Sequence, residues 1–158
     1  MMDNKEKLLK YAIYYLSKYS SSKKNLEFIL KKKIRRLTDE KKIRYQMYQE
    51  IKHIVGRLEK LKLIDDTVYT ESKINSLLSQ IKSKNYIKQY LIRKGINSKI
   101  VDEQIFIFYK KNQNLEKENA LKFAKKRNLT NDKKDYEKNL SKMARAGFSY
   151  EICKKILG

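Results

Sequence analysis

The stretch Leu91-Ile92-Arg93-Lys94-Gly95-Ile96 returns in altered form as Met143-Ala144-Arg145-Ala146-Gly147-Phe148. In both copies an apolar pair precedes Arg, one further residue, Gly and another apolar residue. Glycine directly after a helix can adopt the left-handed conformation that closes the last turn, and the next apolar residue packs back onto that helix. The stretch therefore predicts a helix end, a turn at the glycine and a new helix, built twice.

The residues after each glycine support the same interpretation. We expect the side chains of Ser98 and Ser149 to accept hydrogen bonds from the free amides of the following helix. The chain contains only four glycines, so two at equivalent positions favour a true repeat over coincidence.

A weaker copy lies 61 positions before the middle one, where Leu16 corresponds to Leu77 and Leu26 to Ile87. This copy has Ile34 in place of the glycine. We therefore predict three tandem units, the first enlarged by a longer last helix, over residues 1–64, 65–112 and 113–158.

Composition and apolar spacing predict an all-α fold. Proline and tryptophan are absent, and apolar residues recur three and four positions apart. We expect an elongated array of three three-helix units, related to helix-turn-helix repeats. Ser20 to Ser22, Asp39 and Asp66 are predicted to cap the helices that follow them. The run from Ile105 to Tyr109 is apolar on nearly every side, which indicates either deep burial or a contact surface.

The charge is strongly positive. Lysine and arginine exceed acidic residues by 39 to 18, which gives a net charge of +21. Such a field attracts polyanions, chiefly nucleic acid, or an acidic protein surface. A mutational bias toward lysine codons explains part of the excess, but that bias also favours Glu and leaves the imbalance standing.

Basic residues gather near the predicted helix ends, and each set is either an ordinary solvated face or part of a binding surface. Tyrosines between them, such as Tyr86 and Tyr90, suit either core packing or stacking on bases. The candidate contacts to a partner or to DNA are Lys31, Lys32, Lys33, Arg35, Arg36, Lys82, Lys84, Lys88, Arg93, Lys94, Lys125, Lys126, Arg127, Lys142 and Arg145.

No residue pattern points to catalysis, a cofactor or a metal. The only histidine, His53, and the only cysteine, Cys153, have no partner nearby in the sequence, and no phosphate-binding or metal-binding motif occurs. The sequence contains no secretory segment and no apolar stretch of about 18 residues. We therefore expect a non-enzymatic protein without cofactors, located in the cytoplasm and not in a membrane.

Three stretches resemble the RecX family, the regulators of the bacterial recombinase RecA. Leu63-Ile64-Asp65-Asp66, followed by Tyr69, is similar to the family's Leu-x-Asp-Asp-x-x-Phe-Ala signature. The stretch from Leu91 through Gly95 to Ile96 is similar to Leu-x-x-Lys-Gly-Ile, and Gly147-Phe148-Ser149-Tyr150-Glu151 to the closing Arg-Gly-Phe-Ser-Tyr-Glu. The resemblance covers essentially the whole chain.

This chain departs from the family pattern at three places. Thr70 occupies the position of the usual small alanine, and Lys84-Asn85 lies where many members have a glycine-containing turn. Ala146 replaces a common second arginine.

The resemblance implies a regulator that acts without catalysis. Similar proteins lie in the helical groove of the RecA filament on single-stranded DNA and suppress ATP hydrolysis and strand exchange, which modulates recombination, DNA repair and the SOS response. Three covalent repeats make self-association unnecessary, so we expect a monomer. The alternative from the residues alone is a general DNA-binding helical protein that acts without RecA.

Overall fold

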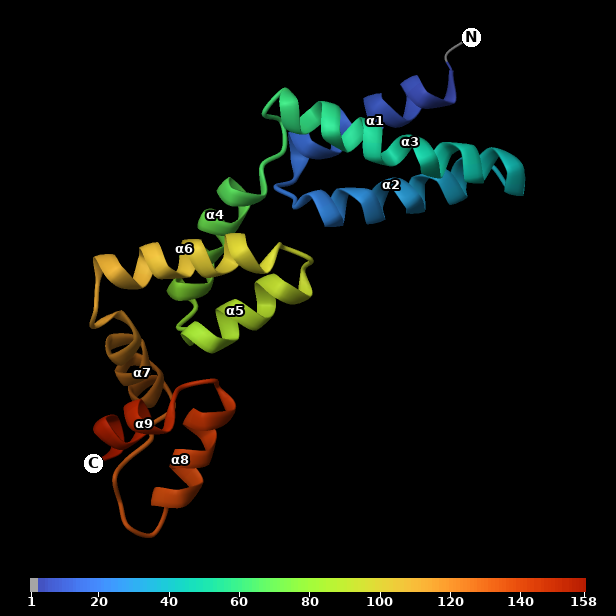
Figure 1. The fold of residues 1–158 in the computed structure, drawn as a ribbon. Coiled ribbons are helices and arrows are strands. Elements are labelled where there is room, and N and C mark those ends of the chain that lie inside the picture. Colours follow the sequence, from blue (N-terminus) through green and yellow to red (C-terminus); the bar gives the residue numbers. More distant parts are fainter. Residues whose placement is uncertain (1–2) are drawn as a thin grey trace. The chain divides into compact units, whose positions relative to one another are not determined.

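The computed structural model describes residues 3–158, and this part of the chain is helical without strands (Figure 1). The predicted all-α class is therefore confirmed. The helices are α1 (Asn4–Lys18), α2 (Lys23–Leu37), α3 (Lys41–Lys60), α4 (Asp66–Ser79), α5 (Lys84–Arg93), α6 (Ser98–Lys111), α7 (Leu115–Lys126), α8 (Tyr136–Arg145) and α9 (Tyr150–Leu157).

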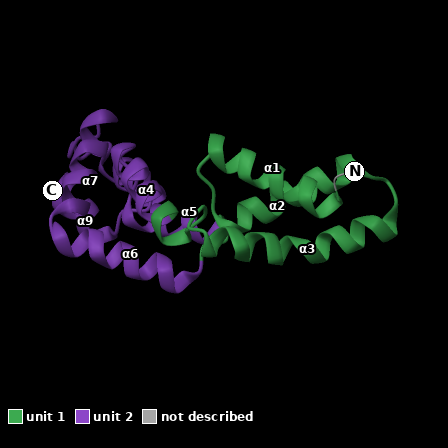
Figure 2. Cartoon of the chain, turned by 90° about the horizontal axis from the view of Figure 1, so that it is seen from above, with its two compact units in different colours: residues 1–69, 94–96 green, residues 70–93, 97–158 purple. Residues whose placement is uncertain are grey.

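The chain divides into two compact units, shown in different colours in Figure 2. Unit 1 comprises residues 1–69 and 94–96, and unit 2 comprises residues 70–93 and 97–158. Three described helices fall within each of the predicted ranges 1–64, 65–112 and 113–158, but the two compact units divide the chain within α4. The three-unit organisation stays a prediction.

Unit 1 is organised around the long helix pair α2 and α3, which lie side by side (Figure 1). Their apolar positions recur at helical spacing, and α1 adds two small or medium side chains to the same core. The buried residues of this core are Leu8, Ala12, Leu26, Leu30, Ile34, Met47, Ile51, Ile54, Val55, Leu58 and Ile64.

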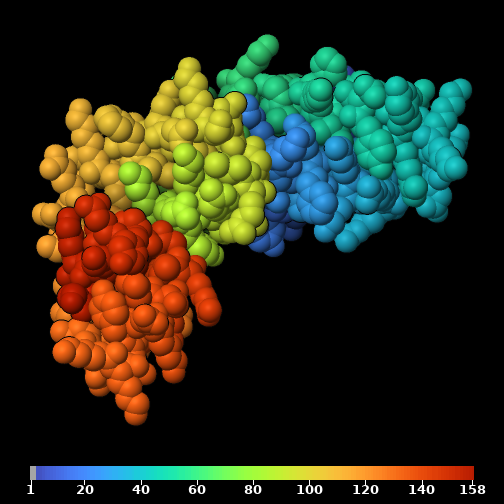
Figure 3. All heavy atoms as spheres, turned by 60° about the horizontal axis from the view of Figure 1, so that its bottom comes forward, coloured from blue at the N-terminus to red at the C-terminus, as the bar shows by residue number. Residues whose placement is uncertain are grey.

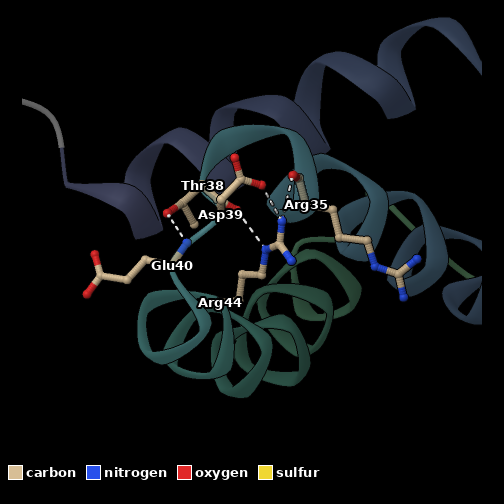
Figure 4. Close-up of polar contacts among 5 residues, drawn as sticks. All are labelled: Arg35, Thr38, Asp39, Glu40 and Arg44. Atoms are coloured by element: carbon tan, nitrogen blue, oxygen red, sulfur yellow. Dashed lines mark hydrogen bonds and ion pairs between the residues drawn. The ribbon is translucent and has the colours of Figure 1, made fainter.

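Arg44 joins the end of α2 to the start of α3 (Figure 4). Its Nε donates to the Thr38 carbonyl at 2.7 Å, and its Nη2 lies 2.8 Å from the Asp39 carboxylate. The same nitrogen donates to the Arg35 carbonyl at 3.3 Å. The prediction that Asp39 caps α3 is therefore wrong: Glu40 is the N-cap residue and makes no capping bond. The guanidinium, held at the carbonyl end of α2, captures the carboxylate instead.

In unit 2, one core lies among α7, α8 and α9. Its buried residues are Ala120, Ala124, Met143, Phe148, Cys153 and Leu157. Helices α4 to α6 bury Ile74, Leu77, Ile87, Leu91, Val101 and Ile105. The apolar run from Ile105 to Tyr109 in α6 is not deeply buried along its whole length, because Phe106 is 63% and Ile107 42% exposed.

Both predicted glycine turns are confirmed. Gly95 has φ of 80° and Gly147 has φ of 96°, which is the left-handed region. Ile81 adopts the same region with φ of 61° although it is β-branched. Its amide donates to the Leu78 carbonyl at 2.9 Å and the Lys82 amide to the Leu77 carbonyl at 3.1 Å, so these bonds close α4 without glycine.

Most predicted serine caps hold. Ser22 and Ser149 each accept a bond from the amide three residues later, at 3.1 and 3.3 Å. The prediction for Ser98 is wrong, because Asn97 is the cap and accepts from the Lys99 amide at 2.9 Å. Asn97 directly precedes the first residue of α6, which places its side chain at the free amides.

Candidate functional site

A carboxylate and a glycine from later in the chain meet the start of α2. The Lys23 amide donates to Asp66 Oδ1 at 2.8 Å. A Cβ added to Gly95 would lie 2.6 Å from Cγ of Lys24, so the glycine turn approaches closely here. We call this contact, made by Ser22, Lys23, Lys24, Asp66 and Gly95, the first joint. All of these residues belong to unit 1.

The first joint corrects the predicted role of Asp66. Its carboxylate does not cap its own helix, because Asp65 Oδ1 takes that role by accepting from the Thr67 and Val68 amides at 2.8 and 3.3 Å. Asp66 is buried, and burial raises its pKa, against which the bond from the Lys23 amide acts. The two adjacent aspartates therefore serve two different helices.

The start of α5 is held in the same way, at positions 61 residues further along. The Lys84 amide donates to Glu116 at 3.0 Å, and a Cβ at Gly147 would collide with Oγ of Ser83. We call this contact, made by Ser83, Lys84, Asn85, Glu116 and Gly147, the second joint. It lies within unit 2.

Ser83 and Asn119 make the second joint tighter. The Ser83 hydroxyl donates to the Ala146 carbonyl at 2.7 Å and accepts from the Tyr86 amide at 3.1 Å. Asn119 Nδ2 donates to the Lys82 carbonyl at 2.8 Å. In the space-filling view, atoms of α5 abut those of the last helices without a gap (Figure 3).

Burial also perturbs the acid at the second joint. It raises the pKa of Glu116, against which the bonds from the Lys84 amide and the Tyr109 hydroxyl act. Burial likewise raises the pKa of Tyr109, whose hydroxyl lies 3.3 Å from Glu116. Their mutual bond acts against burial at Glu116, whose ionised form it favours, and acts with burial at Tyr109, whose protonated form it favours.

Beside the second joint lies a recess of about 420 Å³, which we call the basic groove. Half of its lining residues are cationic and none is acidic. The turn after α4 and the start of α5 contribute one wall, and the carboxyl-terminal ends of α7 and α8 contribute the others. The lining consists of Gln80, Ile81, Lys82, Tyr86, Phe123, Lys126, Arg127, Lys142, Arg145 and Ala146.

Aromatic rings, not carboxylates, hold two of these cations. Lys82 Nζ lies 4.7 Å from the Tyr86 ring centroid, and the Arg127 guanidinium 5.3 Å from that of Phe123. Within residues 3–158, no ion pair involves a cation of the basic groove. Its positive charge is therefore not neutralised by a neighbouring acid.

Tyr86 is not arranged as an open platform for a base. Its ring stacks on Tyr90 with centroids 6.4 Å apart and an interplanar angle of 23°. Lys82 lies over the ring as well. The groove thus presents charges positioned by rings and not a bare aromatic face.

The other predicted basic residues lie elsewhere. Lys31 and Arg35 line a recess in unit 1 that also contains Lys52 and Glu27. In Figure 4 the Arg35 guanidinium points away from the Arg44 contacts. Lys88 is paired with Asp102 at 2.9 Å.

Lys32, Lys33 and Lys84 each lie over a ring, at 4.5, 4.6 and 5.0 Å from the centroids of Phe28, Tyr11 and Tyr109. Arg36, Arg93, Lys94 and Lys125 are exposed.

Sequence reasoning missed part of the groove lining. Nothing in the sequence distinguishes Phe123 from a residue of a helix core, and Ile81 gave no signal because a β-branched residue rarely ends a helix in the left-handed region. The close spacing of Lys126-Arg127 and of Lys142 with Arg145 was the available sign of convergence, but only packing shows that these pairs face one recess.

The remaining singled-out residues serve the fold. Ile96 and Phe148 are buried behind the two glycine turns. Burial raises the pKa of the Cys153 thiol, and His53 is exposed. No cluster of three potential metal ligands occurs in the described chain, and none of its helices is long and apolar enough to span a bilayer.

The comparisons with known proteins agree with one another, although no protein-family model matches the chain. The regulatory protein RecX of Clostridioides difficile is 32% identical over 128 residues, which is 75% of this chain and 59% of that protein. The regulatory protein RecX of Myxococcus xanthus is 25% identical over 92% of this chain and 81% of its own length. The chain thus matches less than two thirds of the C. difficile protein.

Solved structures give the same result. The crystal structure of RecX from Lactobacillus salivarius aligns with a TM-score of 0.74 and 26% identity over 99% of this chain and 96% of that one. A second crystal structure of regulatory protein RecX, 22% identical, shares the fold with a TM-score of 0.72 over 98% of this chain and 71% of its own. In sequence and in fold the chain is similar to RecX proteins, and the resemblance to the RecX family is thereby confirmed.

Proposed function

We propose that this protein regulates RecA without catalysing a reaction. It binds the RecA filament on single-stranded DNA in the filament groove and inhibits ATP hydrolysis and strand exchange. The proposal places it in the cytoplasm as a monomer. The observation that supports it best is the basic groove, with five cations and no acid in its lining, in a chain similar to RecX proteins.

The inhibition follows from differential binding. A protein that contacts several adjacent RecA protomers stabilises whichever arrangement of those protomers fits it. ATP hydrolysis and strand exchange require the filament to pass between arrangements, so selective binding to one of them slows both. The net charge of +21 favours association with the anionic filament over free solution.

The second candidate is a general DNA-binding protein that acts without RecA. The excess of lysine and arginine over the whole chain favours it. This candidate binds bare DNA strongly and loses that affinity steeply with salt, at roughly one unit of log slope for each phosphate neutralised. A filament regulator keeps a component of binding that survives moderate salt.

The test is the ATPase of RecA on single-stranded DNA, titrated with this protein at two salt concentrations. Binding to the same DNA without RecA is measured in parallel. Inhibition below stoichiometric amounts, persisting where binding to bare DNA is lost, supports the filament regulator. Inhibition only at amounts that saturate the DNA means competition for DNA and supports the second candidate.

A further inference from the structure

The basic groove differs from an ordinary lysine-rich surface because hydrogen bonds between its walls hold them together. Its wall at the end of α4 is tied to the rest of unit 2 by Ser83 and Asn119, through bonds of 2.7 and 2.8 Å to the Ala146 and Lys82 carbonyls. Gly147 permits this approach, because any side chain there would meet Ser83. The distances between the walls are therefore fixed before a ligand arrives.

The charges of the groove are held in place as well. Lys82 and Arg127 lie over ring faces, and Lys126, Lys142 and Arg145 are exposed around the same recess. Like charges repel, so a set of five that is gathered around one hollow is stabilised by an anionic ligand with several charges. Closely spaced phosphates satisfy this requirement, and arginine and lysine are the side chains that bind them.

The size of the hollow selects among nucleic acids. A recess of about 420 Å³ admits a flexible strand whose phosphates can turn inward. A double helix holds its phosphates on the outside of a rigid cylinder, and only a few of them can reach the cations of such a recess. Both rings that line the groove already hold one of its cations, Lys82 over Tyr86 and Arg127 over Phe123, so they serve to position charge.

We propose that the basic groove is a direct binding site for the backbone of single-stranded nucleic acid, used without regard to base sequence. This inference rests on the proposed function in that it assigns the regulator's DNA contact to unit 2. The first joint offers no equivalent site, since the positions 61 residues before Lys82 and Tyr86 are Ser21 and Asn25.

The experiment measures binding of a fluorescent oligo-dT by the full chain, without RecA, over a series of salt concentrations. The test variant carries Lys142→Gln with Arg145→Gln, both exposed side chains at the groove. The matched control carries Lys122→Gln with Lys155→Gln, which removes two exposed charges that do not line the groove. Both variants have the same net charge, so a purely global field weakens binding equally in the two.

We expect the groove variant to lose on the order of tenfold or more in affinity and to lower the salt slope by about one to two units relative to the control. An abasic oligonucleotide should bind nearly as well as oligo-dT, and a duplex of equal length less well. Equal binding by the groove and control variants overturns the site. A preference for duplex, or displacement of oligo-dT by ATP at matched phosphate concentration, overturns the assignment to a single strand.

The two proposals fail separately. If the groove variant binds oligo-dT like the control while the wild-type chain inhibits the RecA ATPase, the groove assignment is wrong and the regulator stands. If the groove binds oligo-dT as expected but the wild-type chain leaves the ATPase unchanged, the regulatory function is wrong and the groove stands.

Discussion

The first and second joints share a backbone design and differ in what lies beside them. Each has a serine cap, a carboxylate on the first free amide and a glycine turn from later in the chain. The recess next to the first joint, about 290 Å³, is lined mostly by apolar and tyrosine side chains, including Leu16, Tyr19, Leu63 and Val68. The recess next to the second joint is cationic.

The difference separates what builds the fold from what serves a partner. The serine and the acid recur because each accepts a hydrogen bond from a free backbone amide at the helix start. The glycine recurs because two backbone segments approach closely there. The residues that line the two neighbouring recesses bind no backbone group of this kind, so they can differ between the joints. In this chain, then, the signature residues Asp65, Asp66, Gly95 and Gly147 stabilise the fold. The residues that we propose for binding a partner lie beside them, in the lining of the basic groove.

The largest effect on the two joints is expected when the glycine of each turn is replaced by alanine. Gly147→Ala places a Cβ against Ser83 at a positive φ, so we expect a loss of about 3 kcal/mol in the free energy of unfolding. Gly95→Ala should cost less, about 2 kcal/mol, because its Cβ would meet Cγ and Cβ of Lys24 at 2.6 and 2.9 Å but would displace no hydrogen-bonded group such as the Ser83 hydroxyl.

Urea unfolding followed by circular dichroism measures both changes. Gly56→Ala is the control, since its added Cβ has no neighbour within 4 Å inside α3, and it should gain about 0.5 to 1 kcal/mol. Equal losses for Gly95→Ala and Gly147→Ala would contradict the tighter packing that we assign to the second joint.

Removing the serine cap of each joint tests whether the second joint is the more stable of the two. Ser83→Ala deletes a cap and the bond to the Ala146 carbonyl, so we expect a loss of about 2 kcal/mol. Ser22→Ala deletes the corresponding cap and should cost about 1 kcal/mol. Denaturation midpoints at constant m-value decide between them, and a larger loss for Ser22→Ala would speak against the extra bond.

The acids of the two joints should respond alike to pH, with an effect smaller than those above. Burial raises the pKa of Glu116 above its ordinary value of 4.5 and that of Asp66 above 3.8. In the window above the ordinary value the native state binds more protons than the unfolded state, so the contribution of each acid to stability falls as pH rises through that window.

Glu116→Gln and Asp66→Asn remove this contribution, and the comparison of each variant with the wild-type chain isolates it from other carboxylates. We expect the stability difference between wild type and variant to shift in favour of the wild type as pH is lowered through the window. Urea unfolding at a series of pH values measures it, and a shift of the opposite sign would show that the bonds from the Lys23 and Lys84 amides outweigh burial.

The smallest expected effect concerns Thr70, which has alanine as its usual counterpart. Its side chain is fully buried, and its hydroxyl has no hydrogen-bond partner among the described residues. Thr70→Ala should therefore leave stability unchanged or raise it by up to about 1 kcal/mol, because it removes an unpaired polar group and improves helix propensity. Thr70→Val, which keeps the volume, is the control, and a clear loss in both variants would indicate a bond that the hydroxyl makes in solution.

Local patterns in the sequence were enough to predict the helical class, the turns at Gly95 and Gly147, and the caps at Ser22 and Ser149. These features depend on interactions within a few residues. The role of Asp66 could not be predicted, because its partner, the Lys23 amide, lies 43 residues away. The prediction for Asp39 was wrong for a local reason, since Arg44, which lies close by in the sequence, binds its carboxylate.

The candidate site was predicted only as scattered positive charge. Nothing in the spacing of Lys82, Lys126 and Arg145 indicates that they line one recess, because their convergence depends on how the turn before α5 packs against α7 and α8. The left-handed Ile81 was equally hidden, since helix-end rules look for glycine or asparagine. The charge pattern of the sequence identifies the basic residues that could form a binding site. Tertiary packing determines which of them line the same recess.

The acid at each joint also has a bearing on how the chain acquires its structure during synthesis. The amide that opens α5 finds its carboxylate 32 residues later, at Glu116, and its glycine turn later still, at Gly147. A nascent chain whose last translated residue lies in α6 has therefore made α5 but not the groups that complete its start. The contacts that complete the start of α5 can therefore form only after the segment with Glu116 and Gly147 has been synthesised.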